Sequence, residues 1–123
     1  SKPYGVKIVL GTKTAEYVKD EYFVLELDCI AVKGKKEGVH IYTVLENSEN
    51  KGMWHTSRIH HNRMLELYRA KEFERAIGMC ETLIDSFDGQ MDHYYEAWMD
   101  RCREMLKMKL PKDWDGVYRA TSK

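Results

Sequence analysis

The stretch YFVLELDCIAVKGKKEGVHIYTVLE, residues 22–46, decides the fold because two strand-like runs flank a glycine-containing cationic turn. In both runs apolar side chains recur at every second position, which is the period of a β-strand with one buried face. After Asp28 the apolar positions move to Ile30 and Val32, and such a one-residue slip predicts a β-bulge or bend. We therefore expect a β-hairpin whose turn holds residues 33–36, KGKK.

The residues before this hairpin predict a short strand and a short helix. YGVKIVLG places β-branched and apolar residues between Gly5 and Gly11, which is typical of a strand. TKTAEYVKD follows, and Thr12 or Thr14 can cap a short helix there. Residues 1–46 are thus expected to form a β-α-β-β segment.

From residue 59 onward the apolar period becomes helical. Residues 47–58 are polar, contain Gly52 and predict a linker, although Trp54 is expected to dock onto one of the two halves. Three amphipathic helices follow, and a turn with a short strand closes the chain after Pro111. The apolar stripes of these helices contain Met64, Leu65, Leu67 and Tyr68, then Phe73, Ala76, Ile77, Cys80, Leu83 and Ile84, and finally Tyr95, Trp98, Met99, Cys102, Met105 and Leu106.

The first two of these helices have the spacing of a tetratricopeptide-like pair. That spacing of large, aromatic, small, large and apolar side chains is kept by Leu67, Phe73, Ala76, Cys80 and Leu83. A lone repeat cannot build a solenoid, so the third helix or a neighbouring domain must cap it. The predicted fold is therefore α+β, with a β-α-β-β segment in residues 1–46, a linker in 47–58 and a helical tail with a terminal short strand in 59–123.

Charge, hydrophobicity and cysteine content constrain the partners and the environment that we expect for the chain. The chain has 123 residues, with 20 basic and 20 acidic side chains, so it has no overall field that attracts nucleic acid or a membrane surface. No apolar run approaches the roughly 20 residues of a membrane-spanning helix. Cys29, Cys80 and Cys102 are odd in number and far apart, which predicts buried free thiols in a reducing compartment. Because the chain opens with Ser1 and strand-like residues follow at once, we expect a piece of a longer protein.

Few residues have a pattern that is typical of catalysis or metal binding. His60 and His61 are adjacent, and adjacent helical side chains point about 100° apart, so we expect solvated or capping histidines rather than a metal site. Asp113 and Asp115 lie in a turn, where aspartates commonly accept backbone hydrogen bonds. Lysine beside glycine in residues 33–36 is typical of anion binding, yet charged turns between strands are common. Pattern alone leaves both a solvated turn and a phosphate-holding loop open.

The segment ELDCIAVKGKKEGVHIYTVL, residues 26–45, resembles the last strands of the class III adenylate/guanylate cyclase catalytic domain, in which ELD, VKGK and IY recur in this order. The preceding YGVKIVLGTKTAEYV resembles the strand and helix just before them. The remaining part, with AKEFERAI and the closing DWDGVYRATSK, is similar to the helical tail that follows the catalytic domain in some bacterial cyclases. The resemblance covers almost the whole chain, and the ELD-to-IY segment is its most specific part.

This resemblance implies that a parent protein converts ATP to cyclic AMP and diphosphate in signal transduction. Two catalytic domains of such cyclases pair head to tail, so a homodimer is implied, and two aspartates hold two Mg²⁺ or Mn²⁺ ions that activate the ribose 3′-hydroxyl. Lys33 matches the lysine that contacts the ATP phosphates. The metal aspartates, the purine-selecting residues and the transition-state residues belong to earlier parts of the family's domain. The resemblance thus implies that this chain by itself is inactive and holds no cofactor.

Parents of this kind are cytoplasmic enzymes, and upstream helices can anchor them in the inner membrane. Gly38 stands where the family often has proline, which predicts a looser turn. The alternative reading of the chain is a non-enzymatic module whose helices present a groove to a peptide or a partner subunit. Nucleic acid is not expected as a partner in either case.

Overall fold

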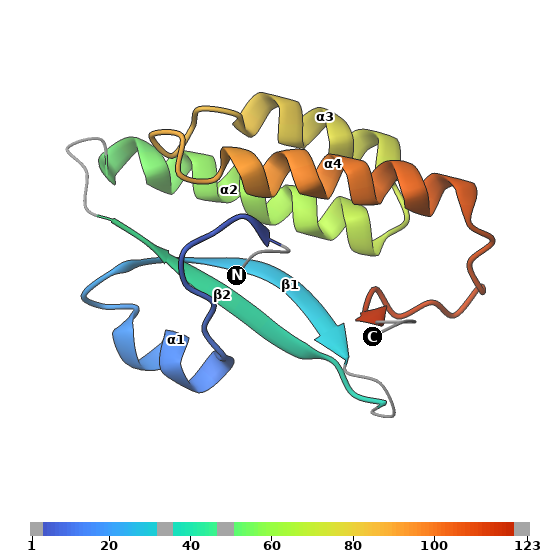
Figure 1. The fold of residues 1–123 in the computed structure, drawn as a ribbon, viewed down its shortest axis with the longest axis horizontal. Coiled ribbons are helices and arrows are strands. Elements are labelled where there is room, and N and C mark those ends of the chain that lie inside the picture. The colour runs from blue at the N-terminus through green and yellow to red at the C-terminus, as the bar shows by residue number, and fades with distance from the viewer. Residues whose placement is uncertain (1–3, 32–35, 47–50, 120–123) are drawn as a thin grey trace.

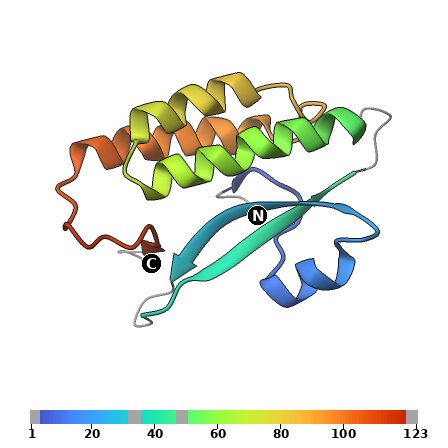
Figure 2. The same ribbon diagram turned by 180° about the vertical axis from the view of Figure 1, so that it is seen from behind.

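A small β-sheet lies between a layer of three helices and one short helix on its other side (Figures 1 and 2). This computed structural model describes residues 4–31, 36–46 and 51–119. Within those ranges no helix has the length and apolar character needed to cross a membrane. The predicted α+β class is confirmed. The elements in chain order are α1 (Thr12–Val18), β1 (Phe23–Ala31), β2 (Val39–Leu45), α2 (Lys51–Arg69), α3 (Phe73–Leu83), α4 (Asp92–Lys107) and β3 (Tyr118–Arg119).

The hairpin of β1 and β2 contains the bulge that the sequence predicts. The strands pair antiparallel, and their register shifts between Glu26 and Asp28, so that Asp28 stands opposite Ile41. Directly opposite residues of an antiparallel pair share a face of the sheet. Asp28 therefore lies on the same face as Ile41, and Leu27, the residue before it at the bulge, is buried as well. The bulge thus turns a carboxylate toward the helical layer.

Strands and helices share one hydrophobic core. The three long helices bury most of their apolar stripes, as their helical period predicts, but Leu106 of α4 is 48% exposed. The cluster of buried side chains runs without a break from Phe23 and Leu45 of the hairpin to Met105 of α4. Trp54 lies inside it, with its ring centroid 5.2 Å from that of Phe23 and 5.9 Å from that of Phe87. Its predicted docking is therefore confirmed, and it contacts both halves of the chain.

Helix α2 begins inside the stretch that was predicted as a linker. Residues 51–58 form its first turns. Trp54 is fully buried, and burying one large aromatic side chain outweighs the polar character of its neighbours. His55 and Thr56 are exposed on this helix, whereas Ser57 and Arg58 are half-buried.

The strand predicted between residues 5 and 11 is reduced to a single bridge. Only Leu10 pairs with β2, where it exchanges both backbone hydrogen bonds with Tyr42. At the next position the hydroxyl of Thr43 donates to the carbonyl of Ile8 at 2.7 Å. The contact of this stretch with β2 therefore consists of one backbone bridge and one side-chain hydrogen bond.

The end of the chain returns from α4 to the sheet (Figure 1). We call residues 111–119 the closing segment. Its last two residues form β3, which adds to β1 and gives the strand order β2-β1-β3. The predicted short terminal strand is confirmed.

Candidate functional site

The predicted phosphate-binding turn lies at the end of the hairpin where β1 stops at Ala31 and β2 starts at Val39. Lys33 belongs to residues 32–35, which lie outside the described part of the chain. Lys36, the last residue of the cationic run, is exposed. The surroundings of the turn are therefore built from the residues that hold its two ends.

The closing segment lies beside the first of these ends. Ile30 pairs with Tyr118 and Ala31 pairs with Arg119, both in parallel orientation. Parallel neighbours need a long crossover connection, and here the chain passes through all three helices of the helical layer between β1 and β3. The chain therefore returns from the helical layer to place β3 beside the end of β1.

Arg119 also contacts the second end of the turn. Its Nη2 donates a hydrogen bond to the backbone carbonyl of Lys36 at 2.9 Å. Nη1 and Nη2 donate to the two carboxylate oxygens of Asp115 at 3.0 and 2.8 Å, which is the two-pronged geometry of strong arginine–carboxylate pairs. The bonds from Arg119 and from the backbone N–H of Val117 lower the pKa of Asp115 to about 2. Asp115 therefore stays ionised at neutral pH and orients the guanidinium toward Lys36.

Two glycines allow the closing segment to pack tightly. A Cβ at Gly38 would lie 2.7 Å from Sγ of Cys29 and 2.8 Å from a methyl carbon of Val117. Gly116 has a φ of +79°, and a Cβ there would lie 2.9 Å from Cγ of Arg69. Neither position accepts a larger residue without a shift of its neighbours. The glycine at position 38, which the sequence associates with a looser turn, permits a close contact in this structure.

Asp28, at the bulge, anchors the helical layer to β1. Its side chain is 1% exposed, and it accepts hydrogen bonds from the Tyr4 hydroxyl at 2.9 Å, Nη1 of Arg101 at 2.7 Å and the Cys29 N–H at 2.8 Å. Burial by itself would lower the pKa of Arg101, but the carboxylate of Asp28 raises it above its ordinary value. The guanidinium also lies 3.9 Å from the ring centroid of Tyr118. The Asp28–Arg101 ion pair thus joins β1 to α4, and the contact of Arg101 with Tyr118 adds β3.

A second ion pair connects α2 with the hairpin. The carboxylate of Glu26 accepts a hydrogen bond from Nη2 of Arg69 at 2.8 Å and also contacts Nδ1 of His40. Arg69 is the residue against which Gly116 packs. The end of α2 therefore supports both the hairpin and the closing segment.

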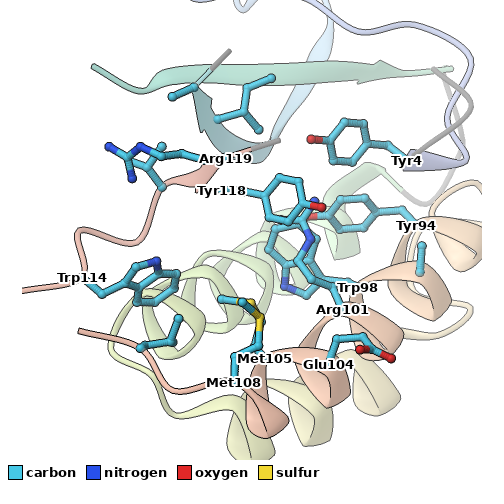
Figure 3. Close-up of a pocket in the computed structure, with 15 residues that line it drawn as sticks. Tyr4, Tyr94, Trp98, Arg101, Glu104, Met105, Met108, Trp114, Tyr118 and Arg119 are labelled. Carbon is cyan, nitrogen blue, oxygen red and sulfur yellow. The ribbon is translucent and has the colours of Figure 1, made fainter. Parts of the chain in front are cut away.

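A cavity of about 830 Å³ opens between α4, the end of β1 and the closing segment (Figure 3). Aromatic and thioether side chains dominate its wall, among them Trp98 and Met105 of α4 with Trp114 and Tyr118 of the closing segment. Its size falls within the roughly 300–1,000 Å³ of small-molecule sites. Arg101 lines the cavity too, but Asp28 holds its guanidinium, so the cavity favours an apolar or aromatic group.

The prediction of solvated or capping histidines is wrong for His61, which is fully buried, whereas His60 is exposed. Nε2 of His61 lies 2.6 Å from the carbonyl of Glu26 and Nδ1 lies 2.8 Å from the Tyr95 hydroxyl. A carbonyl only accepts, so Nε2 carries the proton and Nδ1 accepts from the tyrosine. Burial lowers the pKa of His61 to about 4, so it is neutral. Its place three residues before Met64, on the apolar stripe, is the sequence signal for this burial.

Sequence reasoning foresaw only part of this site. Asp115 accepts the backbone N–H of Val117 at 3.0 Å, as its turn position predicts. The three cysteines are buried and form no disulfide, which confirms the predicted burial of free thiols. Arg119 and Arg101 were missed because their partners lie 83 and 73 positions away in the sequence. The four-residue spacing of Asp115 and Arg119 was the one local feature of the sequence that could have indicated their ion pair.

In the described ranges, no group of three or more His, Cys, Asp and Glu side chains is arranged to hold a metal ion. No family model, curated protein or solved structure matches the chain.

Proposed function

We propose that the chain is the C-terminal part of a class III nucleotide cyclase, with the hairpin closing the catalytic domain and the helical layer following it. The parent converts ATP to cyclic AMP and diphosphate for intracellular signalling, and it works in the cytoplasm as a homodimer. Lys33 contacts the ATP phosphates. Mg²⁺ or Mn²⁺, bound by aspartates of the upstream part, activates the ribose hydroxyl. The chain alone makes no cyclic nucleotide, since it brings only one wall of the active site.

The observation that carries this proposal is that Arg119 holds the described residues on both sides of positions 32–35, namely Ala31 and Lys36. A lysine that stabilises a triphosphate acts best when it is held in advance, because a preorganised charge needs no rearrangement during the reaction. The ladder of β1 and β2 reaches Ile30 and Val39 on one side, and Arg119 binds the carbonyl of Lys36 on the other. A merely solvated turn requires neither a third strand beside it nor a side chain that binds its backbone.

The first test is the activity of the parent with its upstream catalytic region. Purified parent is incubated with ATP and either MnCl₂ or MgCl₂, and cyclic AMP is measured by chromatography. We expect turnover with the parent and none with the 123-residue chain alone. A parent that makes no cyclic nucleotide with either metal would refute the proposal.

The second test assigns the lysine. A charged hydrogen bond contributes roughly 1.5–3 kcal/mol, so Lys33→Ala in the parent should lower kcat/KM for ATP by about tenfold or more. Lys36→Ala is the matched control, because it removes a charge from the same turn while its backbone carbonyl still binds Arg119. Both variants should keep the melting temperature of the parent. An equal loss in the two variants would show a general charge effect and remove Lys33 from the site.

A second candidate function follows from the cavity between α4 and the closing segment. In this candidate the chain is a non-enzymatic interaction module that takes an apolar or aromatic side chain of a peptide or a partner subunit. Ala97 is exposed and lines the cavity, so Ala97→Trp should fill it and abolish binding to a purified partner in calorimetry. Arg103→Trp, at an exposed position of α4 outside the cavity lining, is the control and should leave binding intact. Binding that survives Ala97→Trp would exclude the cavity.

A further inference from the structure

We propose that the cavity between α4, the end of β1 and the closing segment is a binding site for a small, uncharged, planar aromatic molecule of two or more rings. This inference does not rest on the proposed cyclase function. It also differs from the second candidate function, which places a side chain of a peptide or a partner subunit in the same cavity. Every residue that carries it belongs to the described part of the chain.

The size of the cavity suits a molecule of several rings. Its volume is about 830 Å³, whereas an apolar protein cavity of about 150 Å³ already holds a benzene molecule. Its apolar wall also continues out to the mouth, where Met108 and Tyr118 line the cavity and are exposed. A ligand that covers such side chains removes apolar surface from water, which favours binding.

A negatively charged ligand would find no free cation in the wall. Arg101 and Arg119 are the two basic side chains among the described lining residues. Nη1 of Arg101 donates to the carboxylate of Asp28 at 2.7 Å, and Nη1 and Nη2 of Arg119 donate to Asp115 at 3.0 and 2.8 Å. Because each guanidinium already has a counter-ion, an anion would lose its hydration without gaining a partner.

A positively charged ligand is disfavoured because the protein supplies a cation of its own. The guanidinium of Arg101 lies 3.9 Å from the ring centroid of Tyr118 and 4.4 Å from that of Trp98. Aromatic faces attract cations, and these two already serve Arg101. The acidic lining residue Glu104 is 73% exposed and lies 4.0 Å from Nζ of Lys107. A second cation would therefore meet a positive charge in the wall and only a solvated carboxylate at the mouth.

The side chains that remain for a ligand are aromatic rings and thioethers. Trp98 and Met105 of α4 and Trp114 and Tyr118 of the closing segment surround the same space (Figure 3). Aromatic rings prefer stacked or edge-to-face contacts with other rings, and methionine sulfur packs well against them. The wall thus favours a flat aromatic molecule over an aliphatic one of the same size.

The first experiment compares three probes that have the same two rings and differ in charge: naphthylmethanol, naphthoate and naphthylmethylammonium. Each is titrated into the chain at neutral pH, and NMR follows the indole N–H signals of the three tryptophans. We expect naphthylmethanol to bind with a Kd of about 1 mM or tighter. It should shift the signals of Trp98 and Trp114, which line the cavity, but not that of Trp54, which packs against Phe23 and Phe87. No binding, or an equal shift at Trp54, would overturn the inference.

The same titrations test the chemical class of the ligand. The two charged probes should bind about tenfold more weakly than naphthylmethanol, because their charges must stay in water or lose hydration without a partner. Decahydronaphthylmethanol has the same carbon skeleton without aromatic rings and should bind about threefold more weakly or worse. A charged probe that binds as tightly as the alcohol would contradict the inferred neutrality, and a decahydro compound that does so would contradict the preference for aromatic rings.

Two variants of α4 test the location. Ala97 lines the cavity and is exposed, so Ala97→Trp should fill the space and weaken the binding of naphthylmethanol at least about tenfold. Arg103→Trp is the matched control outside the lining and should leave the Kd within about twofold. If Ala97→Trp fails to fold, Met108→Asp decides, because it places an unpaired carboxylate at the exposed mouth and should weaken binding severalfold. Undiminished affinity in the folded variant would overturn the location.

A fourth probe separates a free small molecule from a residue of a peptide. N-acetyltryptophanamide is neutral and has two fused rings, and its two amide groups represent a peptide backbone. It should bind at least about fivefold more weakly than naphthylmethanol, since amides at an apolar wall lose hydrogen bonds to water. Tighter binding of the amide would overturn the inference in favour of a peptide side chain. None of these outcomes bears on the cyclase proposal, which the activity of the parent decides.

Discussion

The ion pair between Asp28 and Arg101 should contribute more to stability than any other charged contact among the described residues. Asp28→Asn removes the charge but keeps the size of the side chain, and it leaves the guanidinium of Arg101 without a counter-ion. The side chain of Asp28 is 1% exposed and that of Arg101 is 17% exposed. Removing one partner of a buried pair typically costs 3–5 kcal/mol, because the remaining charge stays desolvated.

The expected loss lies at the lower end of that range. Arg101 keeps some water contact and remains stacked on Tyr118 and Trp98, 3.9 and 4.4 Å from their ring centroids. We therefore expect Asp28→Asn to lower the free energy of unfolding by about 3 kcal/mol. Arg101→Met should cost about as much, since Asp28 then keeps only neutral donors. In the double variant the two losses should fall short of their sum by about 2 kcal/mol.

Urea unfolding of the chain, followed by tryptophan fluorescence, measures these differences. A constant slope of free energy against urea concentration would show that only stability has changed. Arg103→Met is the control on the same helix, because its partner Asp100 is exposed and the pair should contribute less than about 1 kcal/mol. Single-variant losses below about 1 kcal/mol, or additive losses in the double variant, would refute the view that this pair anchors the helical layer.

Three further predictions concern buried groups and backbone conformation. His61 is neutral in the folded chain, with a pKa of about 4 against 6.5 in the unfolded chain, so its contribution to the free energy of unfolding is complete above pH 6.5 and is lost as the pH falls toward 4. Urea titrations should show a loss of stability on the order of 3 kcal/mol over that interval. The loss of stability should be correspondingly smaller in His61→Gln. Gly116→Ala should destabilise the chain by about 1–3 kcal/mol because φ is +79° and Arg69 blocks the added methyl group, whereas Gly78→Ala, inside α3 with open space around it, should stabilise by about 0.5–1 kcal/mol in the same assay. Burial raises the pKa of the Cys80 and Cys102 thiols, so Ellman's reagent should modify them at pH 8 only after urea unfolds the chain, and rapid labelling of the folded chain would contradict their burial.

Local sequence pattern was sufficient to predict those elements that depend on interactions between residues close together in the chain. The two-residue period and its slip after Asp28 predicted the hairpin and the bulge, because both depend on adjacent side chains. The helical stripes predicted α2, α3 and α4 for the same reason. Composition failed for residues 51–58, where one buried tryptophan decided the structure against many polar neighbours.

Contacts between distant residues were beyond this kind of reasoning. Asp28 is an ordinary polar position in a strand until its partner on α4 is known, since charged side chains are rarely buried unless they are paired. Arg119 is likewise an ordinary surface residue until β3 is seen beside β1. Periodicity reports which face of an element is buried but carries no information on which element will cover it. The residues around the turn therefore came from the structure, and Lys33 from the resemblance alone.

The position of β3 ties these observations together. Because β1 and β3 are parallel neighbours, the hairpin's second strand and all three helices between them act as one crossover connection. The closing segment can reach the turn only if that crossover is folded, and Asp28 with Arg101 and Arg69 with Gly116 then fix it at two points. The helical layer is thus part of the support of the turn, and variants that loosen Asp28–Arg101 should disturb the backbone at Lys36 even though they lie in the core. Faster hydrogen exchange at residues 36–40 in Arg101→Met, under conditions where the chain remains folded, is the expected sign of that connection.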